Sequence, residues 1–513
     1  MDVQIAVLDY GSQYSQLIVR RVRELGYYAK LYPPEALSSL TGLAGVILSG
    51  GPSSVSEPDA PDVDFECLAG MNLPVLGVCY GMQLLNKKFG GELKPGTTSE
   101  YGPARLRIEN DKSLFAGVEE NSQIWMSHSD TVTTLPEGAV VLARNEEGQP
   151  VSLQFKENWY GIQFHPEVTH SHDGRQVLKN YLSCLDTQPE FDVEAFKKEI
   201  LREIVEEVGG REVVCGVSGG VDSTVLAVLL HKAGVKIHPI FVDNGMLRKN
   251  EVEEVQAQFK EVGVEIDTIP AADLFLEALE GVEDPEAKRK IIGNLFLDVF
   301  FKHAGDIQLF AQGTLYPDVI ESATSGSKAS VIKTHHNRVN RIMELKAEGK
   351  VLEPLSELFK DEVRELGRSL GIPERALVRH PFPGPGLAVR CPGLITREKL
   401  DILREADFIF ISTLKKTGWY DKIWQACTTI LPSKSVGVKG DVRAYEFPIS
   451  LRAVISEDAM TADWVEIPYP ILREVSNKIL NGVKGVNRVL FDISTKPPAS
   501  IEWEYLQGHP HAH

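Results

Sequence analysis

The first third of the chain alternates short apolar runs with amphipathic stretches. Residues 5–11, 45–51 and 74–78 are apolar runs of strand length, so we expect three buried strands there. Residues 16–26 carry apolar positions at helical spacing and end in glycine, which predicts a surface helix, and a second helix is expected after Gly81. Strands that alternate with helices in this way are typical of a doubly wound parallel sheet.

A second α/β pattern follows the turn-rich stretch 184–192. A long acidic helix comes first, and apolar runs at 212–220, 236–245 and 307–315 then predict strands. A helix that stops at Gly234 lies between the first two of these runs. We therefore expect a second α/β unit, built on a parallel sheet with covering helices.

The pattern changes again near residue 390. Four prolines and three glycines fall within residues 381–393, where they interrupt regular structure. Beyond them, helices mix with an alternating strand at 442–455, which favours an α+β fold. The chain of 513 residues is long enough for about three domains. The predicted domains are 1–188, 189–388 and 389–513, with an α/β fold in the first two.

The composition limits which partners and which cellular compartment are expected. The chain has 54 Lys and Arg against 72 Asp and Glu, a formal net charge of −18, so no nucleic-acid partner is expected. No apolar run approaches the ~20 residues that span a bilayer, and the N-terminus lacks a basic signal region, so no membrane partner is expected. Six widely spaced cysteines form neither a disulfide framework nor a metal-binding pair, which predicts a cytoplasmic protein.

Cys79 has the surroundings of a catalytic nucleophile. It lies between an apolar strand and a helix, with Gly77 and Gly81 two residues away on either side. A strand–turn–helix elbow with such small neighbours presents its side chain at the carboxyl edge of a sheet, where a helix N-terminus lowers the pKa of a thiol. A single cysteine after an apolar strand is more often a core residue, so partners are needed.

His165 and Glu167 close another apolar strand and supply such partners. Glu167 is expected to face the same way as His165 on extended backbone. His165 would deprotonate Cys79, and Glu167 would hold the imidazole in the useful tautomer. The glycine turn at 49–54 offers backbone N–H groups to an oxyanion. Three pieces at the ends of three predicted strands favour one catalytic unit.

This arrangement resembles the class I glutamine amidotransferase family, whose cysteine attacks the side-chain amide of glutamine. The resemblance implies that glutamine is converted to glutamate and ammonia, with Gly51 and Tyr80 near the oxyanion. It also implies that residues 124–130 border the glutamine pocket.

The run 217–226 joins a predicted strand to a helix and has the character of an anion-binding loop. Its glycines allow a close backbone approach, its hydroxyls add donors, and the helix N-terminus adds its dipole. The candidate binding residues are Ser218, Gly219, Gly220, Val221, Asp222, Ser223 and Thr224. Asp222 indicates Mg²⁺, because a carboxylate beside phosphates repels them unless a cation lies between. The alternative is a purely structural turn with a serine cap. It is disfavoured because the motif is long and directly follows a predicted strand.

The loop resembles that of the ATP pyrophosphatase superfamily, which cleaves ATP between its α and β phosphates and adenylylates an oxygen. The resemblance implies ATP as co-substrate and Mg²⁺ as cofactor, with residues 241–248 on the second strand of that fold. Lys333 and Lys360 are candidate phosphate partners, although either lysine alone is more often a solvated charge.

Residues 313–322, 379–387 and 496–504, with the order of the two sites, resemble the glutamine-hydrolysing GMP synthetase family over almost the whole chain. The resemblance implies XMP as substrate, adenylylated on O2 and attacked at C2 by ammonia, and a homodimer formed through the C-terminal domain. The XMP-binding positions that it implies are Arg289, Asp407, Gln425, Lys496, Ile501 and Glu502.

Two stretches depart from that family. Residues 333–340 lack the glycines common there, and residues 505–513 continue past the usual end with three histidines, which fit a solvated tail better than a metal site. The alternatives are another ATP pyrophosphatase or a sensing protein with decayed sites. A tRNA thiolase would show basic surface and paired cysteines, NAD synthetase uses a different glutaminase, and asparagine synthetase needs a cysteine where Asp2 stands. Retention of both sites disfavours a sensor.

Overall fold

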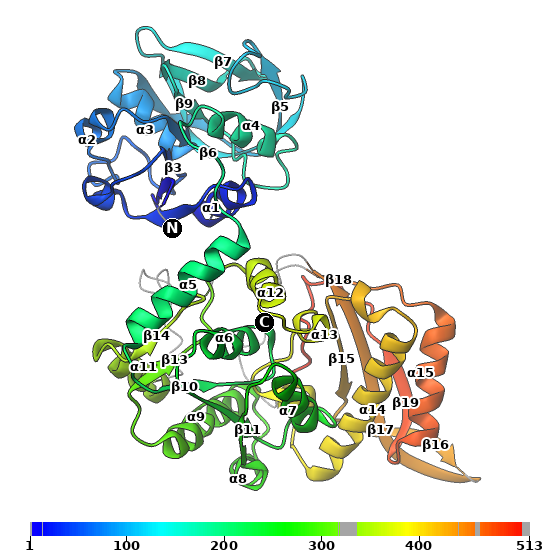
Figure 1. Ribbon diagram of the computed structural model, residues 1–513. Helices are drawn as coiled ribbons and strands as arrows, with labels where there is room; N and C mark the ends of the chain where they lie inside the picture. The colour runs from blue at the N-terminus through cyan, green and yellow to red at the C-terminus, as the bar shows by residue number, and fades with distance from the viewer. Residues whose placement is uncertain are drawn as a thin grey trace. The chain divides into compact units, whose positions relative to one another are not determined.

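The computed structural model describes residues 3–12, 14–316, 318, 336–439, 441–456 and 462–504. The chain divides into two compact units between Phe196 and Lys197 (Figure 1). Helix α5 (Val193–Val208) crosses this division. In the part of the chain that the structure describes, no helix combines the length and the apolar character needed to cross a membrane.

Within the described residues, the first unit contains a nine-stranded sheet. Its first five strands are parallel and lie in the order β2 (Ala29–Tyr32), β1 (Ile5–Leu8), β3 (Gly45–Leu48), β4 (Val75–Val78) and β9 (Trp159–Ile162). The sheet continues antiparallel through β8 (Pro150–Lys156), β7 (Val140–Asn145), β5 (Glu92–Ile108) and β6 (Gln123–Thr134). The predicted parallel strands are confirmed, and the antiparallel extension was not anticipated.

Helices cover both faces of the parallel strands, as the doubly wound prediction requires. Alternate residues of β1 pack in opposite directions, because successive side chains of a strand point to opposite faces. Ile5 and Val7 join a core with α1 (Ser15–Glu24) and α4 (Gly174–Leu182). Ala6 and Leu8 join a second core with η1 (Pro34–Ser39), α2 (Phe65–Gly70) and α3 (Tyr80–Lys88).

The second unit contains a five-stranded parallel sheet. Its order is β12 (Asp267–Pro270), β11 (Ile237–Asp243), β10 (Val213–Gly216), β13 (Leu309–Ala311) and β14 (Val351–Leu352). The expected strands at 212–220 and 307–315 are shorter than predicted, because their ends form loops at the carboxyl edge of the sheet. The helices of this part are α6 (Val221–Lys232), α7 (Glu251–Glu261), α8 (Ala272–Ala278), α9 (Pro285–Ala304), α11 (His336–Ala347), α12 (Lys360–Ser369) and α13 (Glu374–Leu377).

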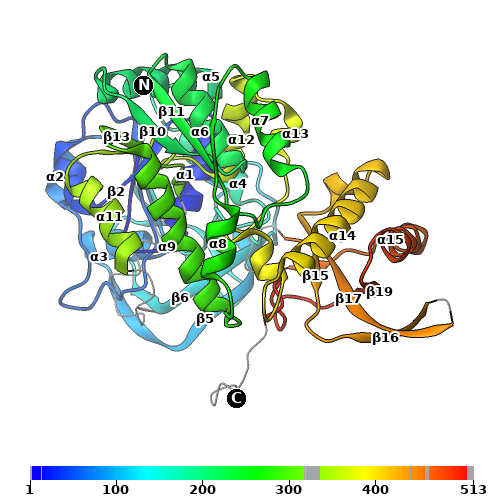
Figure 2. The ribbon, with the colours of Figure 1, turned by 90° about the horizontal axis from the view of Figure 1, so that it is seen from below.

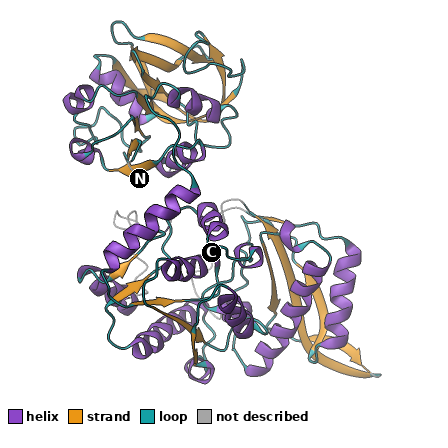
Figure 3. Ribbon diagram, in the orientation of Figure 1, coloured by secondary structure: helices purple, strands orange, loops and turns teal. Residues whose placement is uncertain are grey.

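A second, mainly antiparallel sheet occupies the C-terminal part of the same unit, as the α+β pattern predicted. Its strands are β15 (Gln425–Ile430), β16 (Ser435–Lys439), β17 (Val442–Ile455), β18 (Asp463–Trp464) and β19 (Val486–Phe491). Helices α14 (Arg397–Lys416) and α15 (Tyr469–Gly482) lie side by side on one of its faces (Figures 2 and 3). The short helices η2 (Gly386–Arg390) and η3 (Tyr420–Lys422) lie in the connecting segments.

One hydrophobic cluster spans both sheets of the second unit. Val214 and Ile240 of the parallel sheet belong to the same buried cluster as Phe410 of α14 and Ile449 of β17. Burial of this shared apolar surface ties the C-terminal part to the part that contains the parallel sheet. The boundaries proposed at 188/189 and 388/389 stay predictions.

Candidate active sites

Cys79 occupies a strained elbow between β4 and α3. Its backbone has φ 52° and ψ −104°, a combination of angles that residues other than glycine rarely adopt. Two backbone hydrogen bonds hold the elbow, from Cys79 N to Ile162 O at 2.7 Å and from Gly81 N to Ser49 O at 3.0 Å. Such strain persists only where surrounding structure enforces it, and here it places the buried sulfur at the edge of the sheet, where Cys79 lines a cavity.

Both flanking glycines are required by space. A Cβ on Gly77 would lie 2.6 Å from the carbonyl carbon of Gly81, and a Cβ on Gly81 would lie 2.3 Å from the carbonyl oxygen of Leu48. Neither contact can relax without moving backbone. The sequence prediction that small residues surround the turn therefore has a steric cause.

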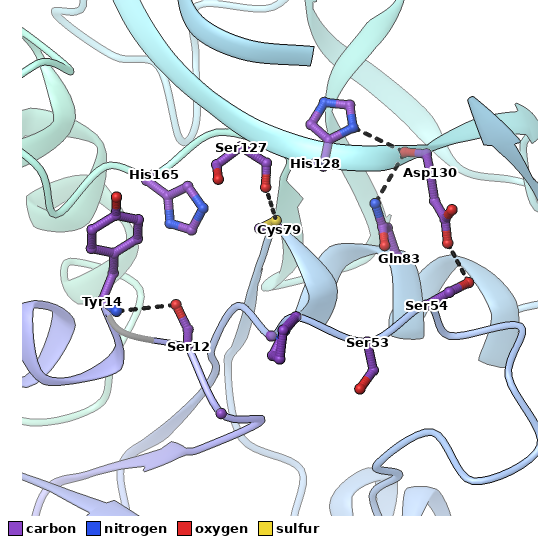
Figure 4. Close-up of a pocket in the computed structure, with 13 residues that line it drawn as sticks. Ser12, Tyr14, Ser53, Ser54, Cys79, Gln83, Ser127, His128, Asp130 and His165 are labelled. Atoms are coloured by element: carbon purple, nitrogen blue, oxygen red, sulfur yellow. Dashed lines mark hydrogen bonds between the residues drawn. The ribbon is translucent and has the colours of Figure 1, made fainter. Parts of the chain in front are cut away.

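His165 and Glu167 meet inside the protein, next to Cys79. His165 Nδ1 lies 2.7 Å from Glu167 Oε1, and both side chains are buried. The sequence predicted that extended backbone would make the two side chains face the same way. Instead, the chain turns directly after His165, and this turn brings the two side chains together. The Nδ1–H group donates to the carboxylate, so Nε2 faces the sulfur. Figure 4 shows the imidazole of His165 pointing toward Cys79.

Two opposing effects set the charge of His165. Burial lowers the pKa of the imidazole, while the charge of Glu167 and hydrogen bonds to Cys79 and Glu167 raise it; the result is a pKa well above the ordinary value. A histidine held protonated beside a thiol stabilises the thiolate form. His165, with its raised pKa and its position next to Cys79, is therefore placed to accept the proton of the thiol.

A cavity of about 370 Å³ opens over the sulfur (Figure 4). Gly51 lines it, and a Cβ on this glycine would lie 2.6 Å from the carbonyl oxygen of Tyr10. Tyr80 begins α3 directly after Cys79, and its hydroxyl donates to Pro61 O. The role of Gly51 and Tyr80 at an oxyanion stays a prediction.

Sequence reasoning missed several polar residues of this cavity. Gln83 lies one helical turn after Cys79 and donates from Nε2 to Asp130 O at 3.2 Å. Ser54 donates to the carboxylate of Asp130, and the ring of Tyr14 packs edge-on against His165 at 5.0 Å between centroids. Helical spacing from Cys79 would have found Gln83. Asp130 belongs to the segment 124–130, which the sequence marked without giving it a chemical role.

The glycine loop of the second unit lies between β10 and α6, at the carboxyl edge of the parallel sheet. Gly219 has φ +73°, which favours glycine. The Thr224 hydroxyl donates to Gly220 O at 2.8 Å, and the backbone N–H of Ser218 donates to the Ser223 hydroxyl at 3.2 Å. These bonds shape the loop into a cradle at a helix N-terminus, the arrangement that binds anions.

Asp222 and Lys360 meet beside this cradle. Lys360 Nζ lies 2.6 Å from both carboxylate oxygens of Asp222. Asp222 and Asp318 both line a cavity of about 350 Å³ that the glycine loop borders. Lys346 and Glu353 also line it and pair at 2.8 Å; nothing in the sequence motif pointed to them. Lys333 lies outside the described residues.

Three of the predicted XMP residues lie near one another in the second unit. Arg289 pairs with Glu286 and Glu504, and Glu502 pairs with Arg390 at 2.7 Å. Burial raises the pKa of the Glu502 carboxyl, against the opposing effects of Arg390 and Arg289. Ile501 is half-buried beside Glu502.

The other three predicted residues are placed differently. Asp407 is buried on α14 and lies 3.2 Å from Arg248, and Gln425 donates to Pro381 O at 3.1 Å. The backbone N–H of Lys496 donates to Ala462 O at 2.8 Å. Asp407 and Gln425 thus engage protein groups.

Sequence reasoning also missed Arg390. It is 2% exposed, and it pairs with Glu502. It lies just beyond residues 379–387, one of the segments that carry the family resemblance, and no spacing rule singled it out. Only the fold brings it to the C-terminal segment.

Three family models match successive parts of the chain. The Glutamine amidotransferase class-I model matches residues 6–184, the NAD synthase model matches residues 193–297, and the GMP synthase C terminal domain model matches residues 412–503.

Curated relatives match nearly the whole length. Proteins named GMP synthase (glutamine-hydrolyzing) from Thermosipho melanesiensis, Carboxydothermus hydrogenoformans and Cytophaga hutchinsonii are 52%, 51% and 49% identical. Each match covers 98% of this chain and 99%, 100% and 100% of the respective relative.

Proposed function

The chain belongs to the family of glutamine-hydrolysing GMP synthases, and from this premise we propose that it converts XMP, ATP, glutamine and water to GMP, AMP, pyrophosphate and glutamate. The observation that carries the proposal is the presence, in one chain, of a buried Cys–His–Glu unit and a separate anion-binding glycine loop. One site releases a nitrogen nucleophile, and the other prepares the carbon that receives it.

In the first unit, the Cys79 thiolate attacks the side-chain amide carbon of glutamine. His165 gives its proton to the departing nitrogen, so ammonia leaves and a thioester remains. Water, deprotonated by His165, then releases glutamate and regenerates the thiol. Backbone N–H groups near Gly51 and Tyr80 stabilise the tetrahedral oxyanion. Glu167 holds the imidazole, as its 2.7 Å contact with Nδ1 supports.

In the second unit, the glycine loop holds the phosphates of ATP. The O2 oxygen of XMP attacks the α phosphorus, and pyrophosphate leaves into the cradle formed by residues 218–224. Ammonia then adds to C2, and AMP departs with the oxygen. Adenylylation is needed because a carbonyl oxygen is a poor leaving group, whereas AMP is a good one.

The donor set around Asp222 fits Mg²⁺. Proteins hold this ion with one or two carboxylates and complete its shell with water and substrate phosphates. Asp222 and Asp318 line the cavity and could supply two such carboxylates. When bound, Mg²⁺ would neutralise phosphate charge. Asp222→Ala should abolish XMP-dependent pyrophosphate release at any Mg²⁺ concentration, and unchanged release would contradict the role.

The XMP pocket is proposed to contain Arg289, Lys496, Ile501 and Glu502, with Asp407 and Gln425 at its border. Arginine and lysine suit the phosphate monoester, and a carboxylate can accept from a purine N–H or a ribose hydroxyl. The proximity of Arg289 to Glu502 and Glu504 supports a pocket at the C-terminal segment.

A homodimer through the C-terminal domain is proposed as well. The hairpin of β16 and β17 exposes Val436, Val438, Val442 and Tyr445, which are 52–72% exposed. A second copy would cover this apolar surface. Sedimentation should give a dimer for the native chain and a monomer for Val438→Glu with Val442→Glu. A native chain that sediments as a monomer would contradict the proposal.

Domain boundaries and compartment are proposed on similar support. The three matched family regions fall within 1–188, 189–388 and 389–513, which we propose as the glutaminase, ATP pyrophosphatase and dimerisation domains. All six cysteines are free thiols, which fits the reducing cytoplasm. Fractionation of cells that produce the protein tests the compartment.

The decisive experiment uses glutamine labelled with ¹⁵N in the side-chain amide. Incubation with ATP, Mg²⁺ and XMP should yield GMP, AMP, pyrophosphate and glutamate in equal amounts, with the label on the exocyclic nitrogen of guanine. A control arm replaces XMP with nicotinic acid adenine dinucleotide, the substrate class of the NAD synthases, and should yield no amidated product. Unlabelled GMP, or amidation only in the control arm, would refute the assignment.

A further inference from the structure

Charged residues of alternating sign connect the glycine loop with Asp407 in the second unit, through three side-chain contacts and one backbone N–H. Arg379 donates from Nη1 to the carbonyl oxygen of Gly219 at 3.0 Å, and its Nη2 pairs with Glu251. Glu251 also accepts from the backbone N–H of Arg248 at 3.0 Å. Arg248 Nε in turn lies 3.2 Å from Asp407 Oδ2. We call Arg379, Glu251, Arg248 and Asp407 the charged bridge.

The bridge is largely shielded from water. Side-chain exposure is 1% for Glu251, 4% for Asp407, 12% for Arg248 and 16% for Arg379. Buried charges remain ionised only when they are paired, and removal of one leaves its neighbours uncompensated. The side chains of Arg379 and Glu251 therefore depend on each other, as do those of Arg248 and Asp407, and the backbone N–H of Arg248 joins the two pairs.

Arg379 determines how the glycine loop presents its backbone. In a trans peptide, the carbonyl of Gly219 and the N–H of Gly220 point in opposite directions. Because Arg379 holds the carbonyl, the N–H is turned the other way, toward the Ser218 hydroxyl at 3.3 Å. Ser218 and Gly220 both line the nucleotide cavity. The bridge thus aims a loop donor at the side where phosphates bind.

The segment that carries Arg379 also contacts the other end. His380 stacks on Tyr420 at 3.7 Å between centroids, donates from Nε2 to Tyr420 O at 2.9 Å and accepts from Ala426 N at 3.2 Å. Burial, with the nearby charge of Arg248, lowers the pKa of His380 to about 4, so the ring is neutral as this bonding requires. The predicted purine-site residue Gln425 binds the carbonyl of Pro381.

We propose that Glu251 is a positioning residue that keeps the pyrophosphate loop and the purine site in register, so that ATP and XMP each tighten the binding of the other. The inference rests on the proposed function, because that proposal assigns XMP to the site bordered by Asp407. Its physical basis is shared ordering. A ligand that fixes one end of the bridge lowers the cost of ordering the other end, and the effect is reciprocal.

The test is calorimetry on the full chain with Mg²⁺ and α,β-methylene ATP, whose α–β linkage cannot be cleaved. For the native chain, we expect XMP to tighten binding of the analogue at least about fivefold, the lower end of usual coupling. Glu251→Gln keeps the shape and removes the charge, and should reduce this factor below about twofold. Glu254→Gln, an exposed residue in the same turn of α7, is the matched control and should leave the factor unchanged.

Two outcomes overturn the inference: no coupling in the native chain, or full coupling in Glu251→Gln. If circular dichroism shows that Glu251→Gln does not fold, Arg379→Lys replaces it, because lysine keeps the charge but lacks the two-nitrogen fork. Retained coupling in Arg379→Lys would then contradict the bridge. Failure of the native chain to make GMP from XMP, ATP and ammonia would refute the proposed function itself, and that assay is run separately.

Discussion

The proposed glutaminase site and the proposed nucleotide site are built in contrasting ways. In the first unit, Cys79 has a backbone φ of 52°, and the neighbouring histidine and glutamate are two residues apart. In the second unit, charged side chains come from distant segments, such as Arg289 and Glu504, which are 215 positions apart in the sequence. Strain and burial dominate one site, while paired charges dominate the other.

The difference follows from the chemistry that each site performs. Covalent attack needs one atom held at one place, which a strained turn with close glycines provides. Transfer of a nucleotidyl group needs positive charge and donors distributed around several phosphates and a purine. We therefore expect substitutions in the first site to act steeply and locally, and those in the second to change affinities.

Replacement of the nucleophile should have the largest effect. Cys79→Ala removes the sulfur, so glutamine-dependent synthesis of GMP should fall by about 10⁴-fold or more. Synthesis from added ammonium salt should remain, because the second unit is untouched. The free thiol Cys67, replaced by alanine, is the control and should support both activities. Loss of the ammonia-dependent activity in Cys79→Ala would mean that the two sites are not separable.

Removal of the carboxylate behind His165 should come next. In Glu167→Gln the burial that lowers the pKa of His165 is no longer opposed by the charge of Glu167, so glutaminase activity should fall by about 10³-fold and the histidine pKa should drop. Activity assays measure the glutaminase rate, and an NMR titration of the imidazole measures the pKa of His165. Glu157→Gln, an exposed residue, is the control.

The same substitution should have a pH-dependent effect on stability. Because the folded pKa of His165 is raised, the stabilisation is present in full below the ordinary value of about 6.5 and is lost as pH rises through the folded pKa. The stability difference between the native chain and Glu167→Gln should shrink over that rise. A difference that grows with pH would contradict the charge state assigned to His165.

Two glycines sharpen the contrast between the loops. Gly81→Ala places a Cβ 2.3 Å from Leu48 O and should destabilise the first unit by about 3 kcal/mol. Gly220→Ala meets only the Ser218 hydroxyl at 3.3 Å, so the melting temperature should hardly change, while the KM for ATP should rise about tenfold through crowding of the phosphates. Thermal melts and initial rates measure both. Equal loss of stability in the two variants would erase the distinction.

The smallest expected effect concerns the C-terminal segment. Lys496→Ala removes one point charge for the XMP phosphate and should raise the KM for XMP several-fold, by up to about tenfold, with glutaminase activity unchanged. The exposed Lys484, replaced by alanine, is the control. A larger effect on the KM for glutamine than for XMP would exclude the assigned pocket.

Local patterns predicted much of the molecule. Continuous apolar runs predicted the parallel strands around Cys79 and the glycine loop, since a strand buried on both faces must be apolar throughout. The antiparallel strands β5 to β8 were not predicted, because their register depends on pairing between distant segments. Gln83 lay within reach of helical spacing, whereas Arg390 and Lys346 carry no local signal.

The candidate reactive groups were already determined by the amino-acid sequence: the cysteine between two glycines, the histidine with a carboxylate two positions later, and the serine–glycine loop before a helix. These features depend on neighbours in the chain, so short-range sterics and strand periodicity encode them. Which charges meet was decided by the tertiary structure alone. Lys360 reaches Asp222, and Arg390 reaches Glu502, because packing of a shared core brings together segments whose separation in sequence holds no record of the contact.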